Sequence, residues 1–117
     1  MNVIEDIHPQ SPTVATIGFF DGVHLGHRFL IQQVKVAATQ TGWQSSIITF
    51  PVHPRQVIQS EFQPQLLSSP EEKIELLAST GVDNCILLPF TRELSQLTAY
   101  EFMQLLYDKY KVRMLVI

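Results

Sequence analysis

Four short runs of β-branched and apolar residues alternate with three longer amphipathic segments along this 117-residue chain. Each run has the length and composition of a buried strand, whereas the apolar residues of the intervening segments recur every three or four positions, as in a helix. Strands that alternate with helices pair side by side in parallel, because each helix returns the chain to the start of the next strand. The order therefore predicts an α/β fold, a parallel sheet with helices on its faces. The predicted strands are 13–20 (TVATIGFF), 45–50 (SSIITF), 84–90 (NCILLPF) and 112–117 (VRMLVI).

The three predicted helices carry start and stop signals. The first begins near Gly26 and stops at Gly42, since glycine readily adopts the left-handed conformation of a helix end. The second and third, within 69–81 and 98–110, each begin with a hydroxyl residue followed three positions later by a glutamate, the pattern of a capping box. Three residues at helical spacing in the third helix are predicted to be half-buried: Tyr100, Met103 and Tyr107.

Composition excludes several classes of protein. The chain is 45% hydrophobic and 16% charged, as in one small globular domain. Its formal net charge of −3 gives no basic field for nucleic acid, and its longest apolar runs are too short to span a bilayer. The acidic N-terminus lacks the long apolar region of a signal peptide, and the single cysteine, Cys85, cannot form an intrachain disulfide. We therefore expect a cytoplasmic protein without nucleic-acid or membrane partners, in which Cys85 packs as a small hydrophobic residue.

The predicted strands also indicate where a ligand would bind. In open α/β sheets, ligands bind outside the carboxyl ends of the strands. Three of these ends, at 21–28 (DGVHLGHR), 51–55 (PVHPR) and 89–94 (PFTREL), are rich in histidine, arginine, proline or aromatic residues. The helix faces carry no such concentration, so the sequence places a functional site at the carboxyl edge of the sheet.

Two histidines follow the first predicted strand. His24 and His27 are three residues apart at a helix start, so both imidazoles can face one point. The unbonded N–H groups and the dipole of that helix favour an anion, and Arg28 adds a positive charge. Imidazoles there can donate to phosphate oxygens whose charge grows in a transition state. An H-x-G-H tetrapeptide also arises by chance as a surface helix cap, but its position after the first strand favours function.

The stretch TIGFFDGVHLGHR at 16–28 resembles the HxGH signature of nucleotidyltransferases, in the form found in bacterial FAD synthetases. Three further stretches resemble the same family: 49–58 (TFPVHPRQVI), 66–83 (LLSSPEEKIELLASTGVD) and 87–102 (LLPFTRELSQLTAYEF). The resemblance covers nearly the whole chain. It implies a Rossmann-like fold of the HxGH nucleotidyltransferase type. One departure lies in the second loop, where the family usually has an aspartate-proline pair and this chain has Pro51-Val52.

The resemblance implies that FMN attacks the α-phosphorus of ATP, giving FAD and pyrophosphate, with Mg²⁺. It assigns His24 and His27 to catalysis. The residues that it places around ATP are Gly18, Phe19, Phe20, Asp21, Gly22, Gly26 and Arg28. The residues that it places around the flavin are Thr49, Phe50, Pro51, His53, Pro54 and Arg55.

The resemblance also implies that 1–117 is the N-terminal part of an FMN adenylyltransferase domain that is incomplete at the C-terminus. The remainder of that domain, with a further phosphate motif, and a riboflavin kinase domain are expected beyond 117. A polypeptide of 1–117 alone is therefore expected to bind adenine nucleotide weakly at best, to make no measurable FAD, and to self-associate through an uncovered edge strand.

Three alternatives stay open. Another HxGH transferase, acting on a pantetheine phosphate or transferring a cytidylyl group, would share the phosphate site, although the loop at 50–55 argues against it. A zinc site of His24, His27 and His53 is possible, but it lacks a cysteine or carboxylate at suitable spacing. The third alternative is a module that binds nucleotide without turnover.

Overall fold

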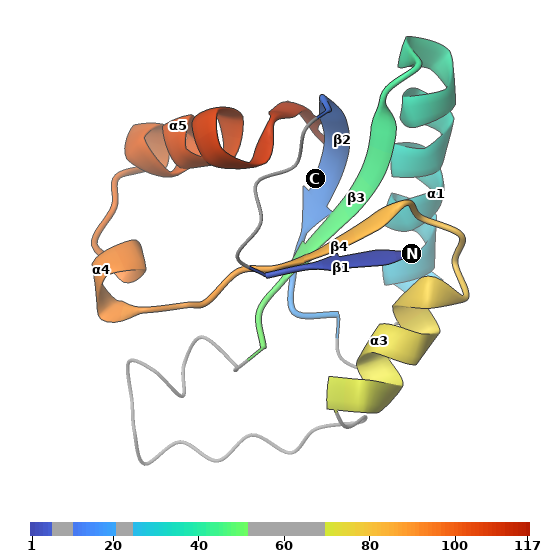
Figure 1. The fold of residues 1–117 in the computed structure, drawn as a ribbon, viewed down its shortest axis with the longest axis horizontal. Helices are drawn as coiled ribbons and strands as arrows, with labels where there is room; N and C mark the ends of the chain where they lie inside the picture. Colours follow the sequence, from blue (N-terminus) through green and yellow to red (C-terminus); the bar gives the residue numbers. More distant parts are fainter. Residues whose placement is uncertain (6–10, 21–24, 52–69) are drawn as a thin grey trace.

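The structure is a computed structural model that describes residues 1–5, 11–20, 25–51 and 70–117, and the structural statements below refer to these residues. Five strands form one sheet in the order β1–β4–β3–β2–β5, with parallel pairing throughout (Figure 1). The predicted α/β fold with a parallel sheet is thus confirmed. The strands are β1 (Asn2–Ile4), β2 (Thr13–Ile17), β3 (Gln44–Thr49), β4 (Asn84–Leu87) and β5 (Val112–Leu115).

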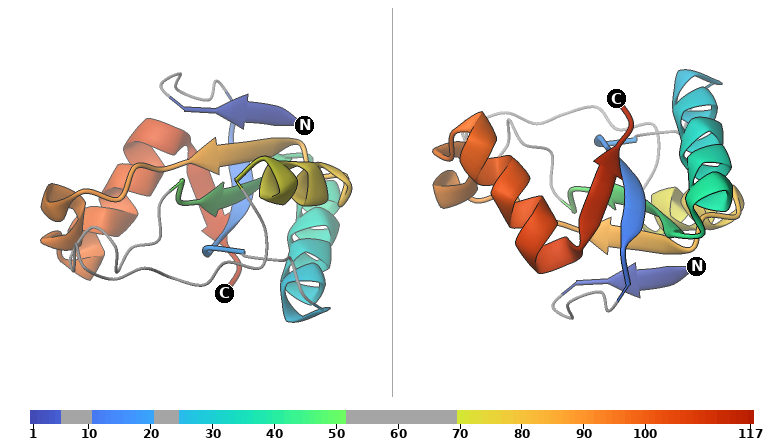
Figure 2. Two further views of the ribbon diagram at one scale, coloured as in Figure 1. Left: turned by 90° about the horizontal axis from the view of Figure 1, so that it is seen from below. Right: turned by 90° about the horizontal axis from the view of Figure 1, so that it is seen from above.

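Helices cover both faces of the sheet, as predicted. Successive residues of β3 point to opposite faces: Ile47 packs with α1 and α3, whereas Ile48 packs with α5. Figure 2 shows α1 and α3 on one side of the sheet and α5 on the other. Of the described helices, none has both the length and the apolar character needed to cross a membrane. The helices are α1 (Leu25–Thr41), α3 (Pro70–Ala78), α4 (Arg92–Ser95) and α5 (Ala99–Tyr110).

The predicted helix ends are found where the structure describes them. Thr98 and Glu101 form both bonds of a capping box at the start of α5. Gly42 and Gly81 follow α1 and α3 with φ angles of 74° and 83°, the left-handed conformation that favours glycine. Ser69, the predicted cap of α3, lies outside the described residues. Local capping chemistry therefore fixes these boundaries largely independently of the tertiary fold.

All four predicted strands end earlier than predicted, and two of them end three residues early. The run 13–20 is a strand only to Ile17, because the chain turns at Phe20, whose φ of 59° is incompatible with a strand. The run 84–90 is a strand only to Leu87. In both cases apolar residues continue past the end of the strand, since Phe20 and Leu88 are buried in the core. Residues that are buried but not in a strand give the same apolar sequence pattern as residues of a buried strand.

Two short elements are absent from the prediction. β1 has three residues and pairs with β4, which places it at one edge of the described sheet. α4 has four residues, and its N-cap, Thr91, accepts a hydrogen bond from the N–H of Leu94. Elements of this length are too short to show a period of two or of 3.6 in the sequence.

Candidate active site at the carboxyl ends of the strands

The loops that follow β2 and β3 lie against each other at the carboxyl edge of the sheet. The N–H of Gly18 donates to the carbonyl of Ile48 at 3.0 Å, and the Thr49 hydroxyl donates to the carbonyl of Phe19 at 2.9 Å. Gly18 and Phe19 belong to the predicted ATP side of the site, and Thr49 belongs to the predicted flavin side. The structure therefore brings these two predicted groups together.

Lys73 of α3 reaches into this junction and was missed by sequence reasoning. Its Nζ donates to the carbonyl of Phe50 at 2.9 Å and to that of Phe19 at 3.1 Å. The Lys73 residue is only 5% exposed. A signal was present in the sequence, because Lys73 lies one turn before Leu77, on the face of α3 that packs in the core. A lysine at a core-facing position needs an explanation, since charged groups are rarely buried without partners.

Phe20 connects the loop after β2 with the first turn of α1. Its ring is buried and meets the ring of His27 edge to face, with centroids 4.8 Å apart and planes at 64°. Gly18 makes room for this ring, since a Cβ at Gly18 would lie 3.1 Å from it. The structure thus gives Gly18 a packing role. The closer approach of its backbone to a ligand stays a prediction.

The first turn of α1 presents two further predicted residues to solvent. Gly26 and Arg28 are exposed, whereas His27 is half-buried. A positive helix end beside an exposed guanidinium group suits an anion. The predicted role of these residues in phosphate binding is compatible with this arrangement and stays a prediction.

Several predicted residues lie outside the described part of the chain, and their roles stay predictions. The pairing of His24 with His27 and the alternative zinc site fall in this group. Among the described residues, no three histidine, cysteine, aspartate or glutamate side chains are grouped so that they could hold a metal ion. The predicted site residues that lie outside the described part of the chain are Asp21, Gly22, His24, His53, Pro54 and Arg55.

An apolar pocket of about 520 Å³ opens beside the junction, on the face of the sheet that α5 covers. Gly18 and Phe50 contribute to it from the two loops. The Phe50 ring meets that of Phe90 edge to face at 5.4 Å. Apolar and aromatic walls of this kind suit a flat aromatic ring. The other lining residues are Ile17, Leu94, Ser95, Leu97, Thr98, Ala99 and Phe102.

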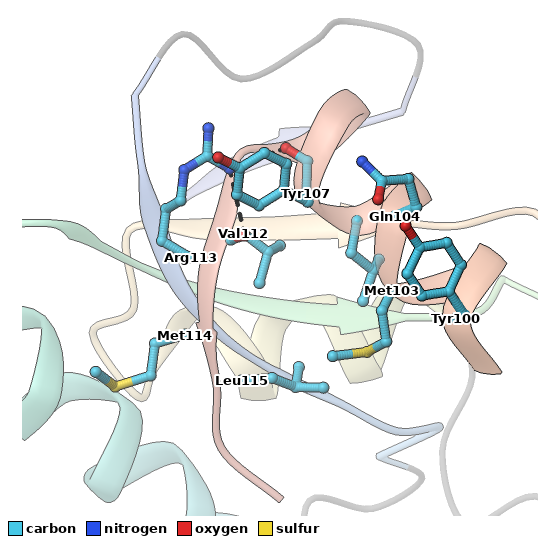
Figure 3. A pocket seen from close by; sticks show the side chains of 9 residues that line it. Tyr100, Met103, Gln104, Tyr107, Val112, Arg113, Met114 and Leu115 are labelled. Atoms are coloured by element: carbon cyan, nitrogen blue, oxygen red, sulfur yellow. Dashed lines mark hydrogen bonds between the residues drawn. The ribbon is translucent and has the colours of Figure 1, made fainter.

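A second hollow, of about 290 Å³, lies between α5 and the edge strand β5 (Figure 3). Tyr100, predicted to be half-buried, is 76% exposed, whereas Met103 and Tyr107 are 49% and 50% exposed. Helical spacing marks one face of a helix but does not say how deeply each residue is buried, and the fully buried residues of α5 are Leu106 and Tyr110. The hollow contains none of the predicted site residues.

Cys85 has no catalytic character. It is fully buried in β4. Burial raises the pKa of its thiol to about 11, and the nearby positive charge of Lys73 offsets only part of that effect. The thiol is therefore protonated at neutral pH. Its packing role was predicted and is confirmed.

The parallel sheet, the helices on both of its faces and the histidine at the start of α1 define a Rossmann-like nucleotidyltransferase domain. A crystal structure titled a macrolide-efflux protein, from Streptococcus pneumoniae, superposes with a TM-score of 0.87 at 27% identity, over 99% of this chain and 40% of that one. The family model for FAD synthetase matches residues 6–117, and the chain therefore belongs to the FAD synthetase family.

Three curated relatives are named bifunctional riboflavin kinase/FMN adenylyltransferases. The protein from Listeria monocytogenes is 41% identical over 76% of this chain and 29% of its own length. That from Escherichia coli K12 is 33% identical over the whole chain and 39% of its own length. That from Bacillus subtilis is 31% identical over 87% of this chain and 35% of its own length. This chain thus spans between 29% and 39% of these relatives.

Proposed function

We propose that the complete protein transfers AMP from ATP to FMN, giving FAD and pyrophosphate. Membership of the FAD synthetase family carries this proposal. A phosphate oxygen of FMN forms a bond to the α-phosphorus of ATP, and the bond from that phosphorus to the bridging oxygen breaks as pyrophosphate leaves. FMN is already an anion, so the step needs no strong base, and catalysis consists of positioning and charge stabilisation.

Each part of the site has a role in this proposal. His27, with His24, donates to phosphate oxygens as charge develops on them. The backbone from Gly18 to Gly22 lines the phosphates of ATP, and Arg28 adds positive charge. The loop 49–55 faces the flavin. The support for this division is the junction of the two loops, where Gly18 of the predicted ATP group and Phe50 of the predicted flavin group line one apolar pocket.

The apolar pocket is proposed to hold the flavin ring. Its volume of about 520 Å³ lies in the usual range for small-molecule sites. Phe50 belongs to the predicted flavin loop and lines this pocket together with Phe90.

Among the described residues, no three ligating side chains are grouped so that they could hold Mg²⁺ without the substrate. Magnesium usually binds through one or two carboxylates together with substrate phosphates. We propose that Mg²⁺ enters with ATP, and the steps above do not depend on a metal held by the described residues.

Residues 1–117 are proposed to be the N-terminal part of the adenylyltransferase domain. The support is the share of the curated relatives that this chain spans. By the same proposal, riboflavin kinase activity belongs to the part of those relatives that this chain does not match.

The deciding experiment incubates the full-length protein with ATP, Mg²⁺ and FMN and separates the products by chromatography. FAD and pyrophosphate should form in equal amounts, and neither should form without FMN. Phosphopantetheine in place of FMN tests another acceptor. Bound ATP without any FAD would instead support a module that binds nucleotide without turnover.

The proposed flavin pocket has its own test. Phe90→Ala should weaken FMN binding about tenfold in a fluorescence titration, because an aromatic contact is lost, and should leave ATP binding unchanged. Tyr107→Ala is the matched control, since Tyr107 lines the other hollow. Weaker ATP binding with unchanged FMN binding would place the nucleotide, not the flavin, in this pocket.

A further inference from the structure

We infer that Lys73 is a positioning residue of this site: its buried ammonium group fixes the loops after β2 and β3 relative to each other and, through Phe20, fixes His27. The effect on turnover rests on the proposed function, whereas the effect on the His27 ring does not. Lys73 belongs to α3, far in sequence from both loops, so it can act as a tie between them.

The contacts of Lys73 join two backbone segments. Its Nζ donates to the carbonyl of Phe50 at 2.9 Å and to that of Phe19 at 3.1 Å, and it lies 3.4 Å from the Thr49 hydroxyl. The same group lies 4.0 Å from the centroid of the Phe19 ring. Hydrogen bonds from a charged donor are stronger and shorter than neutral ones. These contacts hold two carbonyls, one from each loop, in a fixed orientation.

Stability alone is a poor explanation for this lysine. Taking an ammonium group out of water is costly, and replacing a buried charge together with its partners by apolar groups is often neutral or stabilising. The neighbouring positions Leu77 and Cys85 are apolar and buried, so methionine would fit the surroundings. Methionine, however, has no side-chain N–H group and cannot donate hydrogen bonds to the two carbonyls. The feature unique to lysine here is the control of loop geometry.

The contact to Phe19 extends to His27 through one peptide unit. The Phe19 carbonyl belongs to the peptide bond that leads into Phe20, so its direction sets the orientation of the Phe20 backbone. Phe20 has a φ of 59°, a conformation that a bulky residue adopts only when its surroundings hold it there. Its ring then packs against the ring of His27. Release of the Phe19 carbonyl therefore moves the surface on which His27 rests.

Lys35 provides a matched control within the same fold. Its Nζ donates to the carbonyl of Thr80 at 2.7 Å, at the amino edge of the sheet. It is also a lysine that links a helix to a distant carbonyl. It contacts neither of the two loops in the described structure. Lys35 lies on α1, eight residues after His27, but its bond is to the opposite edge of the sheet, so its loss should remove a similar bond without disturbing the Phe20 ring.

The experiment compares Lys73→Met, Lys73→Arg and Lys35→Met in the full-length protein, with FAD formation measured below the unfolding temperature. Lys73→Met should lower kcat by about 10²-fold, as a misplacement of about 1 Å does, with a smaller change in KM for ATP. Lys73→Arg should recover most of the loss, since it keeps the charge and the donors. Lys35→Met should keep the kcat of the wild type.

The second readout needs no activity. In histidine-labelled protein, the NMR shifts of the His27 ring should change in Lys73→Met and stay unchanged in Lys35→Met, because only the first variant disturbs the Phe20 ring. A wild type that forms no FAD would refute the proposed function while this readout still tests Lys73. Unchanged kcat and unchanged His27 shifts in a folded Lys73→Met would overturn the inference.

If Lys73→Met does not fold, Lys73→Gln tests the same tie. Its amide keeps a donor, but it is uncharged and shorter than lysine, so it should not hold the carbonyls of Phe19 and Phe50 together. A change in the His27 shifts supports the inference, and unchanged shifts contradict it.

Discussion

At the amino ends of β2, β3 and β4, buried polar side chains bond to one another across the strands. The hydroxyls of Thr13 and Ser46 lie 2.6 Å apart, and the Asn84 amide donates to Ser46 at 3.1 Å and to the Gln44 amide oxygen at 2.9 Å. These groups use their hydrogen-bonding capacity within the fold. A closed network of this kind stabilises one arrangement and offers little to a ligand.

The carboxyl ends of the same strands are built differently. There a buried ammonium group bonds to loop carbonyls, Phe20 holds a left-handed conformation, and the pocket between Phe50 and Phe90 is open. Each of these features adds little to stability or lowers it. One sheet thus carries a stabilising edge and an edge whose costs the proposed binding site would explain. Substitutions at the amino edge should therefore lower stability, whereas substitutions at the carboxyl edge should lower turnover.

The largest effect is expected at the carboxyl edge, from His27→Ala in the full-length protein. Loss of one donor to developing charge typically lowers kcat by about 10²–10³-fold. Steady-state kinetics with ATP and FMN measure the change, and KM for ATP should change much less. A higher KM with kcat intact would restrict His27 to ground-state binding and would remove the main functional distinction between the edges.

At the amino edge, Asn84→Ala should lower stability by about 1–3 kcal/mol, because the partners of a buried amide lose their bonds. Equilibrium urea denaturation measures this change. Asn2→Ala is the control, since Asn2 is exposed and its bond to Asn84 is 3.4 Å long. The kcat of both variants should equal that of the wild type. Lower turnover in Asn84→Ala, with stability preserved, would contradict the division between the edges.

The fold was predictable from the sequence because its signals are local. Strands buried on both faces are continuous apolar runs, and the capping box at Thr98 forms within one helical turn. The lengths of the strands were less predictable. The residues 18–20 are as apolar as a strand, and only the bond from Gly18 to Ile48 and the turn at Phe20 show where the strand ends.

The site was predictable only in part, since its position follows from topology but its contacts do not. The edge at which ligands bind follows from the order of strands and helices, and His27 lies there. Lys73 contacts residues more than twenty positions away in sequence, so no local pattern names its partners. What the sequence does contain is a charge on the buried face of α3, which marks the residue without identifying its role.

Two glycines offer a smaller and more direct comparison of the edges. Gly18→Ala should lower kcat about fivefold, since the new Cβ would meet the Phe20 ring at 3.1 Å and displace this ring, which packs against His27, by a fraction of an ångström. Gly42→Ala should instead lower stability by about 1–2 kcal/mol, because alanine disfavours the φ of 74° at the end of α1.

Kinetics and urea denaturation on both glycine variants decide the comparison. A fall in kcat for Gly42→Ala, at the amino edge, would show that loss of stability alone lowers turnover. The Gly18 result could then not be attributed to displacement of Phe20.

The smallest expected effect concerns Glu101, a polar group beside the carboxyl edge that has a structural role only. Its carboxylate accepts a hydrogen bond from the backbone N–H of Thr98, which holds the pKa of Glu101 below its ordinary value of 4.5. Because folding favours the charged form, the bond stabilises the protein above about pH 4.5 and is lost as pH falls through the lowered pKa. Glu101→Gln should therefore be slightly less stable than the wild type at pH 7, equal to it in acid, and unchanged in kcat. Urea denaturation of both proteins at pH 7 and below pH 4 measures the difference. A gap in stability that persists in acid would assign the effect to side-chain packing instead of charge, and a lower kcat would extend the functional edge to the start of α5.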